Sequence, residues 1–137
     1  MTGATPLPSF GADELLARFI IFKKWLRADQ SVRPDAFFPP NDLNLSVTRH
    51  GNLIEPELWK LGQQVADAVS LKRDAKLCGR ADVTVQQVTE QKLSIVAFPL
   101  TDNPNHTHIT DWPVEKPVQK ALAQELAKAA GKCVLPE

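Results

Sequence analysis

The side chains best suited to chemistry gather between residues 102 and 112. His106 and His108 lie two residues apart, Asp102 and Asp111 flank them, and Trp112 follows directly. Two imidazoles at positions i and i+2 of a strand point the same way and could share a metal ion. A zinc site would need further ligands from distant parts of the chain, and nothing in the sequence requires them. We therefore predict no metal site and no cofactor.

Two catalytic patterns involve the same histidines. Residues 108–110 form one His-x-Thr element of the two-histidine phosphoesterases, in which each histidine handles one proton. Those enzymes need two such elements, and His50 does not begin a second one. Ser46 is available as a nucleophile for His106, although no nucleophile elbow or glycine-rich phosphate loop is present. Ser46 and His106 are therefore the catalytic candidates if the protein is an enzyme.

Length and composition predict one small domain. A chain of 137 residues buries about 68% of its extended surface, which is enough for a single core. Residues 1–11 are small, polar and interrupted by prolines, so we expect a flexible tail followed by a domain over 12–137. No apolar run approaches the ~18 residues that cross a bilayer, so we expect no membrane partner and a cytoplasmic location. Cys78 and Cys133 are then expected to be free thiols.

Positive and negative charges balance over the whole chain. Sixteen lysines and arginines face sixteen acidic residues, so no global field favours nucleic acid. Two local groups are basic, but Asp29, Asp35 and Asp74 interleave them, so we interpret both as solvated faces and expect no nucleic-acid partner. The first group is Lys23, Lys24, Arg27 and Arg33, and the second is Lys72, Arg73, Lys76 and Arg80.

Alternation of apolar and polar residues predicts most of the strands. Period-two patterns indicate strands over 43–49, 81–86 and 106–110, and an apolar run predicts another over 93–98. The segment 15–26 fits two structures, because its apolar residues have helical spacing while the bulky run within it also suits a strand over 17–22.

Two helices are predicted. Pro56 can open the first, whose apolar stripe continues to about residue 70. Pro117 can open the second and Gly131 can end it, with lysines in the last turn where the helix dipole favours cations. This order of elements predicts an α+β fold, a mainly antiparallel sheet of about five short strands with two helices packed on one face.

An ordered set of motifs resembles an uncharacterised family of small bacterial proteins. The resemblance spans about residues 17 to 130. Its motifs are Arg-Phe-Ile at 18–20, Phe-x-Pro-Pro-x-Asp-Leu-x-Leu-Ser-Val-x-Arg at 37–49, Leu-Trp-x-Leu-Gly at 58–62, Gly-Arg-Ala-Asp at 79–82 and His-x-x-Ile-x-x-Trp-Pro at 106–113.

The resemblance implies which positions recur, but it implies no activity, cofactor or substrate. It favours the strand over 17–22, since the family begins with a short extended segment. The position of His108 varies in the family, which weakens both patterns that need a second histidine. The recurring residues are Arg18, Ser46, Arg49, Arg80, His106 and Trp112.

A histidine accompanied by arginines and a serine has the composition of an anion site. Arginines can fork a phosphate or carboxylate, and a histidine can donate or shuttle a proton. We therefore expect Arg18, Arg49, Arg80 and Trp112 to bind ligand beside His106. The same residues could instead form a structural network of hydrogen bonds without any ligand.

These observations favour a protein-binding accessory component of a larger system, of the defence or toxin–antitoxin type. The domain is small, its charge is balanced and no catalytic pattern is complete, so we expect a protein partner. The alternative is an enzyme or binder of a nucleotide or other phosphate-bearing small anion, using His106 with arginines. A second alternative is single-stranded nucleic-acid binding.

Overall fold

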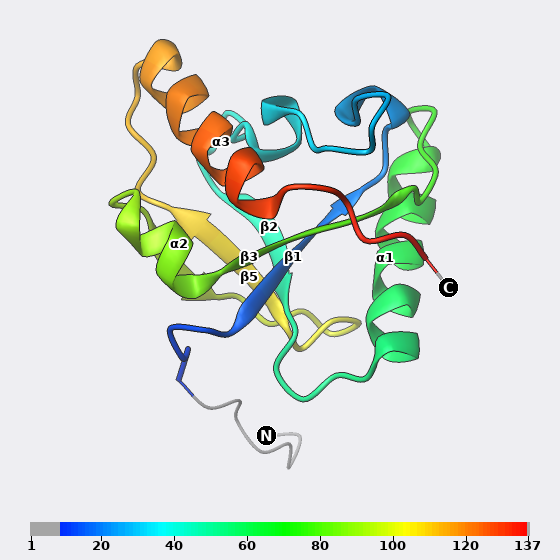
Figure 1. The fold of residues 1–137 in the computed structure, drawn as a ribbon. Coiled ribbons are helices and arrows are strands. Elements are labelled where there is room, and N and C mark those ends of the chain that lie inside the picture. The colour runs from blue at the N-terminus through cyan, green and yellow to red at the C-terminus, as the bar shows by residue number, and fades with distance from the viewer. Residues whose placement is uncertain (1–8, 137) are drawn as a thin grey trace.

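The computed structural model of the chain describes residues 9–136 and contains one five-stranded antiparallel sheet. The spatial order of the strands is β3-β1-β2-β5-β4, so the first strand of the chain lies inside the sheet (Figure 1). The predicted α+β class and antiparallel sheet are confirmed. The strands are β1 (Leu15–Ile20), β2 (Leu45–Arg49), β3 (Gly79–Thr84), β4 (Ser94–Ala97) and β5 (His106–Thr110).

The ambiguous N-terminal segment forms a strand. All six residues of β1 are in register with β3, whereas only Leu16 and Ala17 pair with β2. The neighbouring strands β1 and β2 therefore separate after Ala17. Of the predicted tail, residues 1–11, the structure describes only residues 9–11. Phe10 in this segment packs against the core, and the guanidinium of Arg49 lies 4.0 Å from the centre of the Phe10 ring.

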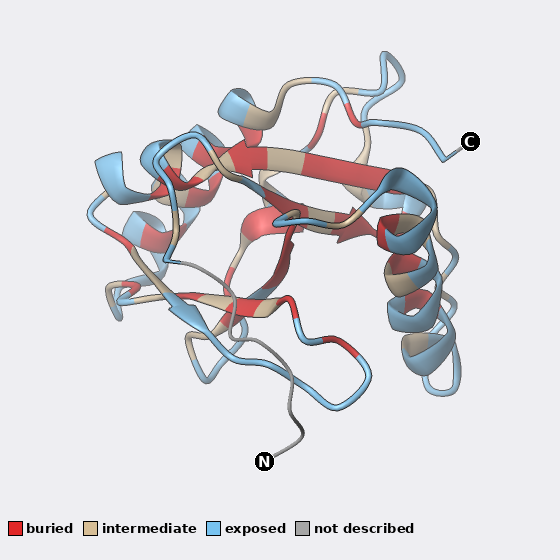
Figure 2. Ribbon diagram, turned by 90° about the horizontal axis from the view of Figure 1, so that it is seen from below, coloured by how far each residue is buried: buried red, intermediate tan, exposed pale blue. Residues whose placement is uncertain are grey.

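The helices lie on both faces of the sheet, which corrects the prediction of two helices on one face. Leu16 and Ile20 of β1 belong to the core beneath α3 (Lys116–Ala130) and α2 (Val85–Glu90). Ala17 and Phe19 point the other way, into a smaller core under α1 (Glu55–Ser70). Figure 2 shows buried residues along the strands and on the inward sides of the helices. A strand that is apolar on both sides needs a cover on each.

The helix α2 has no counterpart among the predicted elements. The predicted strand over 81–86 ends at Thr84, where a capping box starts the helix. The hydroxyl of Thr84 accepts a hydrogen bond from the backbone N–H of Gln87, whose side-chain carbonyl accepts from the N–H of Thr84. Val85 and Val88 then face the core, so the apolar period changes from two to three. No helix among residues 9–136 is long and apolar enough to cross a membrane.

Within residues 9–136, no helix covers half of one sheet face. α1 packs over β1, and the side chains on the same face of β2, β5 and β4 remain partly accessible. Ser46, His108 and Val96 form one row across these three strands. This open half-face and the side of α1 together enclose a cavity.

The close approach of α1 to β1 depends on Gly62. A methyl group at this position would lie 2.7 Å from the ring of Phe19, which is buried. We expect Gly62→Ala to lower the free energy of unfolding by about 1–2 kcal/mol, because overpacking outweighs the gain in helix propensity. Urea unfolding followed by circular dichroism measures this difference. Lys60→Ala, on the exposed side of the same helix, should change it by less than about 0.5 kcal/mol, and an equally stable Gly62→Ala would contradict the close packing.

Candidate functional site

A cavity of about 270 Å³ lies between α1 and the open half of the sheet, and we call it the α1 cavity. Apolar side chains from α1 and β1 line much of it, and the polar groups come mainly from β2, β5 and the turn before β5. Three of the candidate residues from the sequence, Arg18, Ser46 and His106, line this one cavity. The other lining residues are Phe19, Ile21, Val47, Thr48, Leu61, Gln64, Val65, Ala68, Val69, Leu100, Asp102 and Asn103.

Arg18 occupies the gap where β1 and β2 separate. Its Nε donates a hydrogen bond to the carbonyl of Ala36 at 2.7 Å, and one terminal nitrogen donates to the carbonyl of Ser46 at 3.0 Å. The guanidinium also lies 5.1 Å from the ring centre of Trp25. Within residues 9–136 no carboxylate forms an ion pair with it. Burial lowers the pKa of Arg18 to about 10, so the group stays charged at neutral pH.

His106 and His108 form an aromatic cluster with Phe98 on the open half-face. The Nδ1 of His106 lies 2.9 Å from the carbonyl of Phe98, so a proton on Nδ1 would donate to this carbonyl and leave Nε2 as an acceptor. The rings of Phe98 and His108 stack with centres 4.5 Å apart. Burial, and then the charge of His106, lower the pKa of His108, while Asp42 opposes this shift.

The two catalytic candidates share the cavity without touching. Ser46 pairs across the strands with His108, and His106 pairs with Thr48. No hydrogen bond joins Ser46 to His106 in the described part of the chain, and the partner of His106 Nδ1 is a backbone carbonyl. A nucleophile and base would need such a hydrogen bond and an orienting group, so their catalytic roles stay a prediction.

Arg49 is held outside the cavity by an acidic partner. Its Nε and one terminal nitrogen donate to the two carboxylate oxygens of Glu14 at 2.7 and 2.6 Å. The side chain is almost fully buried. This bidentate pair joins β2 to the segment before β1, and it leaves no free fork for a ligand.

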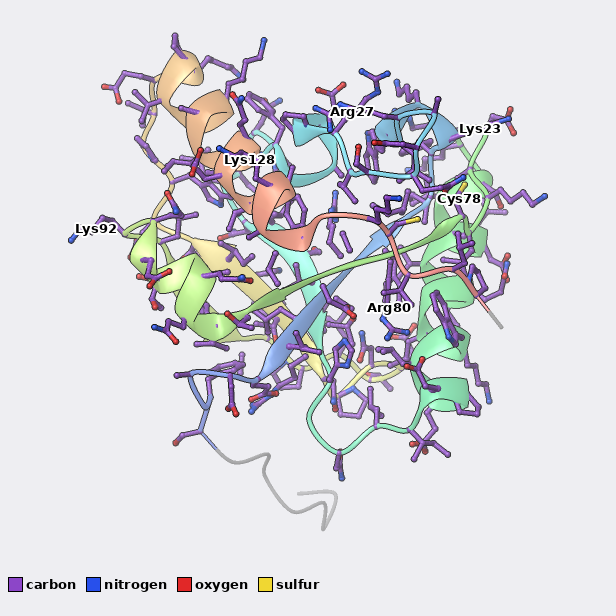
Figure 3. The ribbon with its side chains drawn as sticks, viewed as in Figure 1. Lys23, Arg27, Cys78, Arg80, Lys92 and Lys128 are labelled. Carbon is purple, nitrogen blue, oxygen red and sulfur yellow. The ribbon has the colours of Figure 1, made fainter. Side chains whose placement is uncertain are left out.

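Arg80 is also engaged by carboxylates. Its terminal nitrogens donate to Glu55 at 2.7 and 2.9 Å, and its Nε donates to Asp82 at 3.0 Å. It lies 4.8 Å from the ring centre of Trp59, between β3 and α1 (Figure 3). Asp82 in turn contacts His50 at 2.9 Å. Burial by itself lowers the pKa of Arg80, but the Glu55 and Asp82 carboxylates outweigh it and raise the pKa overall.

Trp112 lies in the core beneath α3 and does not reach the α1 cavity. Its indole N–H donates to the carbonyl of Ile109 at 3.0 Å, which fixes the joint between β5 and the following helix. The predicted ligand-binding set therefore divides. Arg18 lines the cavity, whereas Arg49, Arg80 and Trp112 make contacts that stabilise the fold.

The sequence did not identify the apolar wall of the cavity or the acidic partners of the arginines. Val65 and its neighbours belong to the apolar stripe predicted for this helix, and in the structure they line the cavity. The pair Arg80 and Asp82 had a signal, because residues two apart on a strand share a face. No sequence pattern indicated that Glu14 and Glu55 pair with arginines, because both are distant in sequence from the arginines that they bind.

Metal ligands do not converge in the structure. Over residues 9–136, no group of three or more histidines, cysteines or carboxylates is arranged to hold a metal ion. Cys78 and Cys133 are free thiols.

Comparisons with known proteins return no match. This holds for models of protein families, for curated proteins and for solved structures. The resemblance to a family of small bacterial proteins therefore stays a prediction.

Arg80→Ala tests whether this arginine is structural. It would leave the largely buried carboxylate of Asp82 without its main cation, and we expect a loss of about 3 kcal/mol of unfolding free energy at neutral pH. The hydrogen bond from Arg80 lowers the pKa of Glu55, with a further contribution from the charge of Arg80, although burial acts in the opposite direction. The Glu55 contribution is therefore present above about pH 4 and is lost as the pH falls through the lowered pKa.

Chemical unfolding at several pH values measures this effect. The difference between wild type and Arg80→Ala should shrink in acid. Lys128→Ala removes an exposed cation 3.8 Å from Glu125, and it should change stability by less than about 0.5 kcal/mol. An Arg80→Ala variant as stable as wild type at neutral pH would show that the arginine is free to serve a ligand.

Proposed function

We propose that this protein binds a small organic anion with an apolar body in the α1 cavity. The observation that carries the proposal is the guanidinium of Arg18. It is charged, Arg18 is among the residues that line a largely apolar cavity, and no carboxylate among residues 9–136 forms an ion pair with it. An anionic ligand would provide the missing counter-charge.

The hydrogen bonds of Arg18 favour a carboxylate or phosphate as the charged group. A guanidinium carries five N–H donors, and the carbonyls of Ala36 and Ser46 occupy two of them. The remaining donors suit oxygens held in a planar pair or fork. Asp102 also lines the cavity, but it is exposed, so solvent screens its repulsion of an anion.

The walls of the cavity favour a small apolar body. Phe19, Leu61, Val65 and Val69 contribute hydrocarbon surface. A volume of about 270 Å³ is just below the usual range for drug-sized ligands, so it suits a medium-chain or single-ring acid better than a dinucleotide. With its proton on Nδ1, His106 presents Nε2 as an acceptor, so it can receive a hydrogen bond from a hydroxyl or N–H on the body of the ligand but not from the ionised head group.

Octanoate and octanol test the role of charge, because they share a hydrocarbon chain and differ in the head group. We expect octanoate to bind about ten- to a hundred-fold more tightly, as a hydrogen bond to a charged group contributes about 1.5–3 kcal/mol. Arg18→Gln should remove this preference, whereas Arg33→Gln removes an exposed arginine and should preserve it. Titration followed by NMR chemical shifts measures both affinities.

A second variant tests the cavity without altering Arg18. Ala68 lies on the side of α1 that lines the cavity, and Ala68→Trp would fill it. We expect this variant to fold and to lose affinity for both compounds. Octanoate binding that is unchanged in Ala68→Trp would place the site elsewhere and overturn the proposal.

A protein-binding role, in a defence or toxin–antitoxin system, is the second candidate, and the outer edge of β4 favours it. This strand is at the end of the sheet, and Val96, Phe98 and Leu100 are about half exposed at 47%, 50% and 41%. No charged residue occurs between residues 93 and 101 to discourage pairing. An uncharged extended segment of a partner could add there as a further strand.

Ala97→Pro tests the β4 edge. The N–H of Phe98 donates to His106 of β5, so the N–H one residue earlier points away from the sheet. Proline at 97 removes that outward donor at a position that an edge strand tolerates. We expect a partner identified by cross-linking in the native cell to lose affinity for this variant, while octanoate binding stays unchanged. A partner that binds Ala97→Pro as well as wild type would place the protein interface elsewhere.

A further inference from the structure

Three residues of the first basic group and two of the second line one open groove. One side is made of residues 21–24, 26–28 and 30, the other of residues 73, 74 and 76–78, with Leu135 as a further lining residue, and we call this space the basic groove. Figure 3 shows Lys23, Arg27 and Cys78, which come from both sides, at the same end of the molecule. We propose that the basic groove binds the phosphate backbone of single-stranded nucleic acid.

The groove concentrates positive charge in a chain whose net charge is zero. Within residues 9–136, Asp74 is the single carboxylate that lines it. The lining cations are exposed, and within residues 9–136 none of them forms an ion pair. They are therefore free to neutralise phosphates. These cations are Lys23, Lys24, Arg27, Arg73 and Lys76.

Backbone contacts hold the two sides of the groove together. The N–H groups of Lys76 and Cys78 donate to the carbonyls of Ile21 and Ile20 at 2.9 and 2.7 Å. Arg73 lies 4.4 Å from the ring centre of Phe22, so a residue from one side is placed over the other. The charges are thus attached to a preformed surface, and binding does not require the two segments to assemble.

The shape of the groove favours a polymer over a small phosphate ester. Its volume is about 1200 Å³, above the roughly 300–1,000 Å³ of small-molecule pockets, and it is open to solvent. Ile21, Leu26 and Leu77 provide apolar surface beside the cations, which suits sugars and bases next to phosphates. Because the surface is concave, a single strand can enter it, whereas a flat bilayer would contact only its rim.

Salt dependence provides the main test. Anisotropy of a fluorescein-labelled oligothymidylate, titrated with wild-type protein at several salt concentrations, gives the affinity and its slope against salt. For single strands each phosphate contact adds about 0.7 to that slope. Replacing Arg73 and Lys76 together by glutamine should therefore lower the slope by about 1.4 and reduce affinity roughly 25-fold at about 0.1 M salt.

A matched pair of substitutions separates the groove from general charge. Lys120 and Lys128 are exposed on α3, and their replacement by glutamine removes the same charge away from the groove. We expect this control to keep the wild-type slope to within experimental error, and both double variants to keep the wild-type thermal unfolding curve and octanoate affinity.

Three results would overturn the proposal. The first is no oligonucleotide binding at low salt, and the second is an equal loss of affinity in the two double variants. The third is binding to phosphatidylserine vesicles without binding to the oligonucleotide, which would assign the positive charge to a membrane surface. Octanoate binding is independent of the basic groove, so failure here leaves the α1 cavity proposal unaffected.

Discussion

β1 is apolar on both of its sides, and this constraint determines how the rest of the chain is arranged. Leu16 and Ile20 require a cover on one face of the sheet, and Ala17 and Phe19 require one on the other. β1 lies inside the sheet, between β3 and β2, and α3 and α1 cover its opposite faces. The two cores, one under α3 and one under α1, follow from that position.

The same strand also creates the opening from which the candidate site develops. β1 stays paired with β3 along its whole length, while β2 leaves it after Ala17. The separation leaves the carbonyl of Ser46 without a partner on β1, and Arg18 donates to it as well as to the carbonyl of Ala36, in the segment before β2. The guanidinium of Arg18 therefore stabilises the fold through its hydrogen bonds and also carries a charge that no carboxylate within residues 9–136 neutralises. Removing it would affect both, which is why a cavity-filling substitution on α1 is the cleaner probe of binding.

Sequence patterns predicted the strands well because burial on one side leaves a period of two. The strand over 106–110 has its histidines and its buried residues on the predicted faces. The layer to which each helix belongs could not be predicted in the same way, since an apolar stripe shows that a helix is covered but not by which face. Residues 17–22 held the missing information, because apolar residues on both faces of a strand imply a cover on each side. α2 was missed because its first valine continues the alternation of β3, and the capping box at Thr84 was the signal against that continuation.

The sequence predicted which types of residue form the candidate site, but not which of the three arginines line it. Arg18, Arg49 and Arg80 look alike in the sequence. They differ in whether a carboxylate pairs with them in the folded chain. Glu14 is 35 residues from Arg49 and Glu55 is 25 residues from Arg80, so only the folded chain shows that these two are neutralised. A neutralised, buried arginine orders the elements that it joins and has few donors to spare for a ligand. Arg18 and the cations of the basic groove lack such partners within residues 9–136, and this difference in pairing is the physical reason to look for anions at those two places.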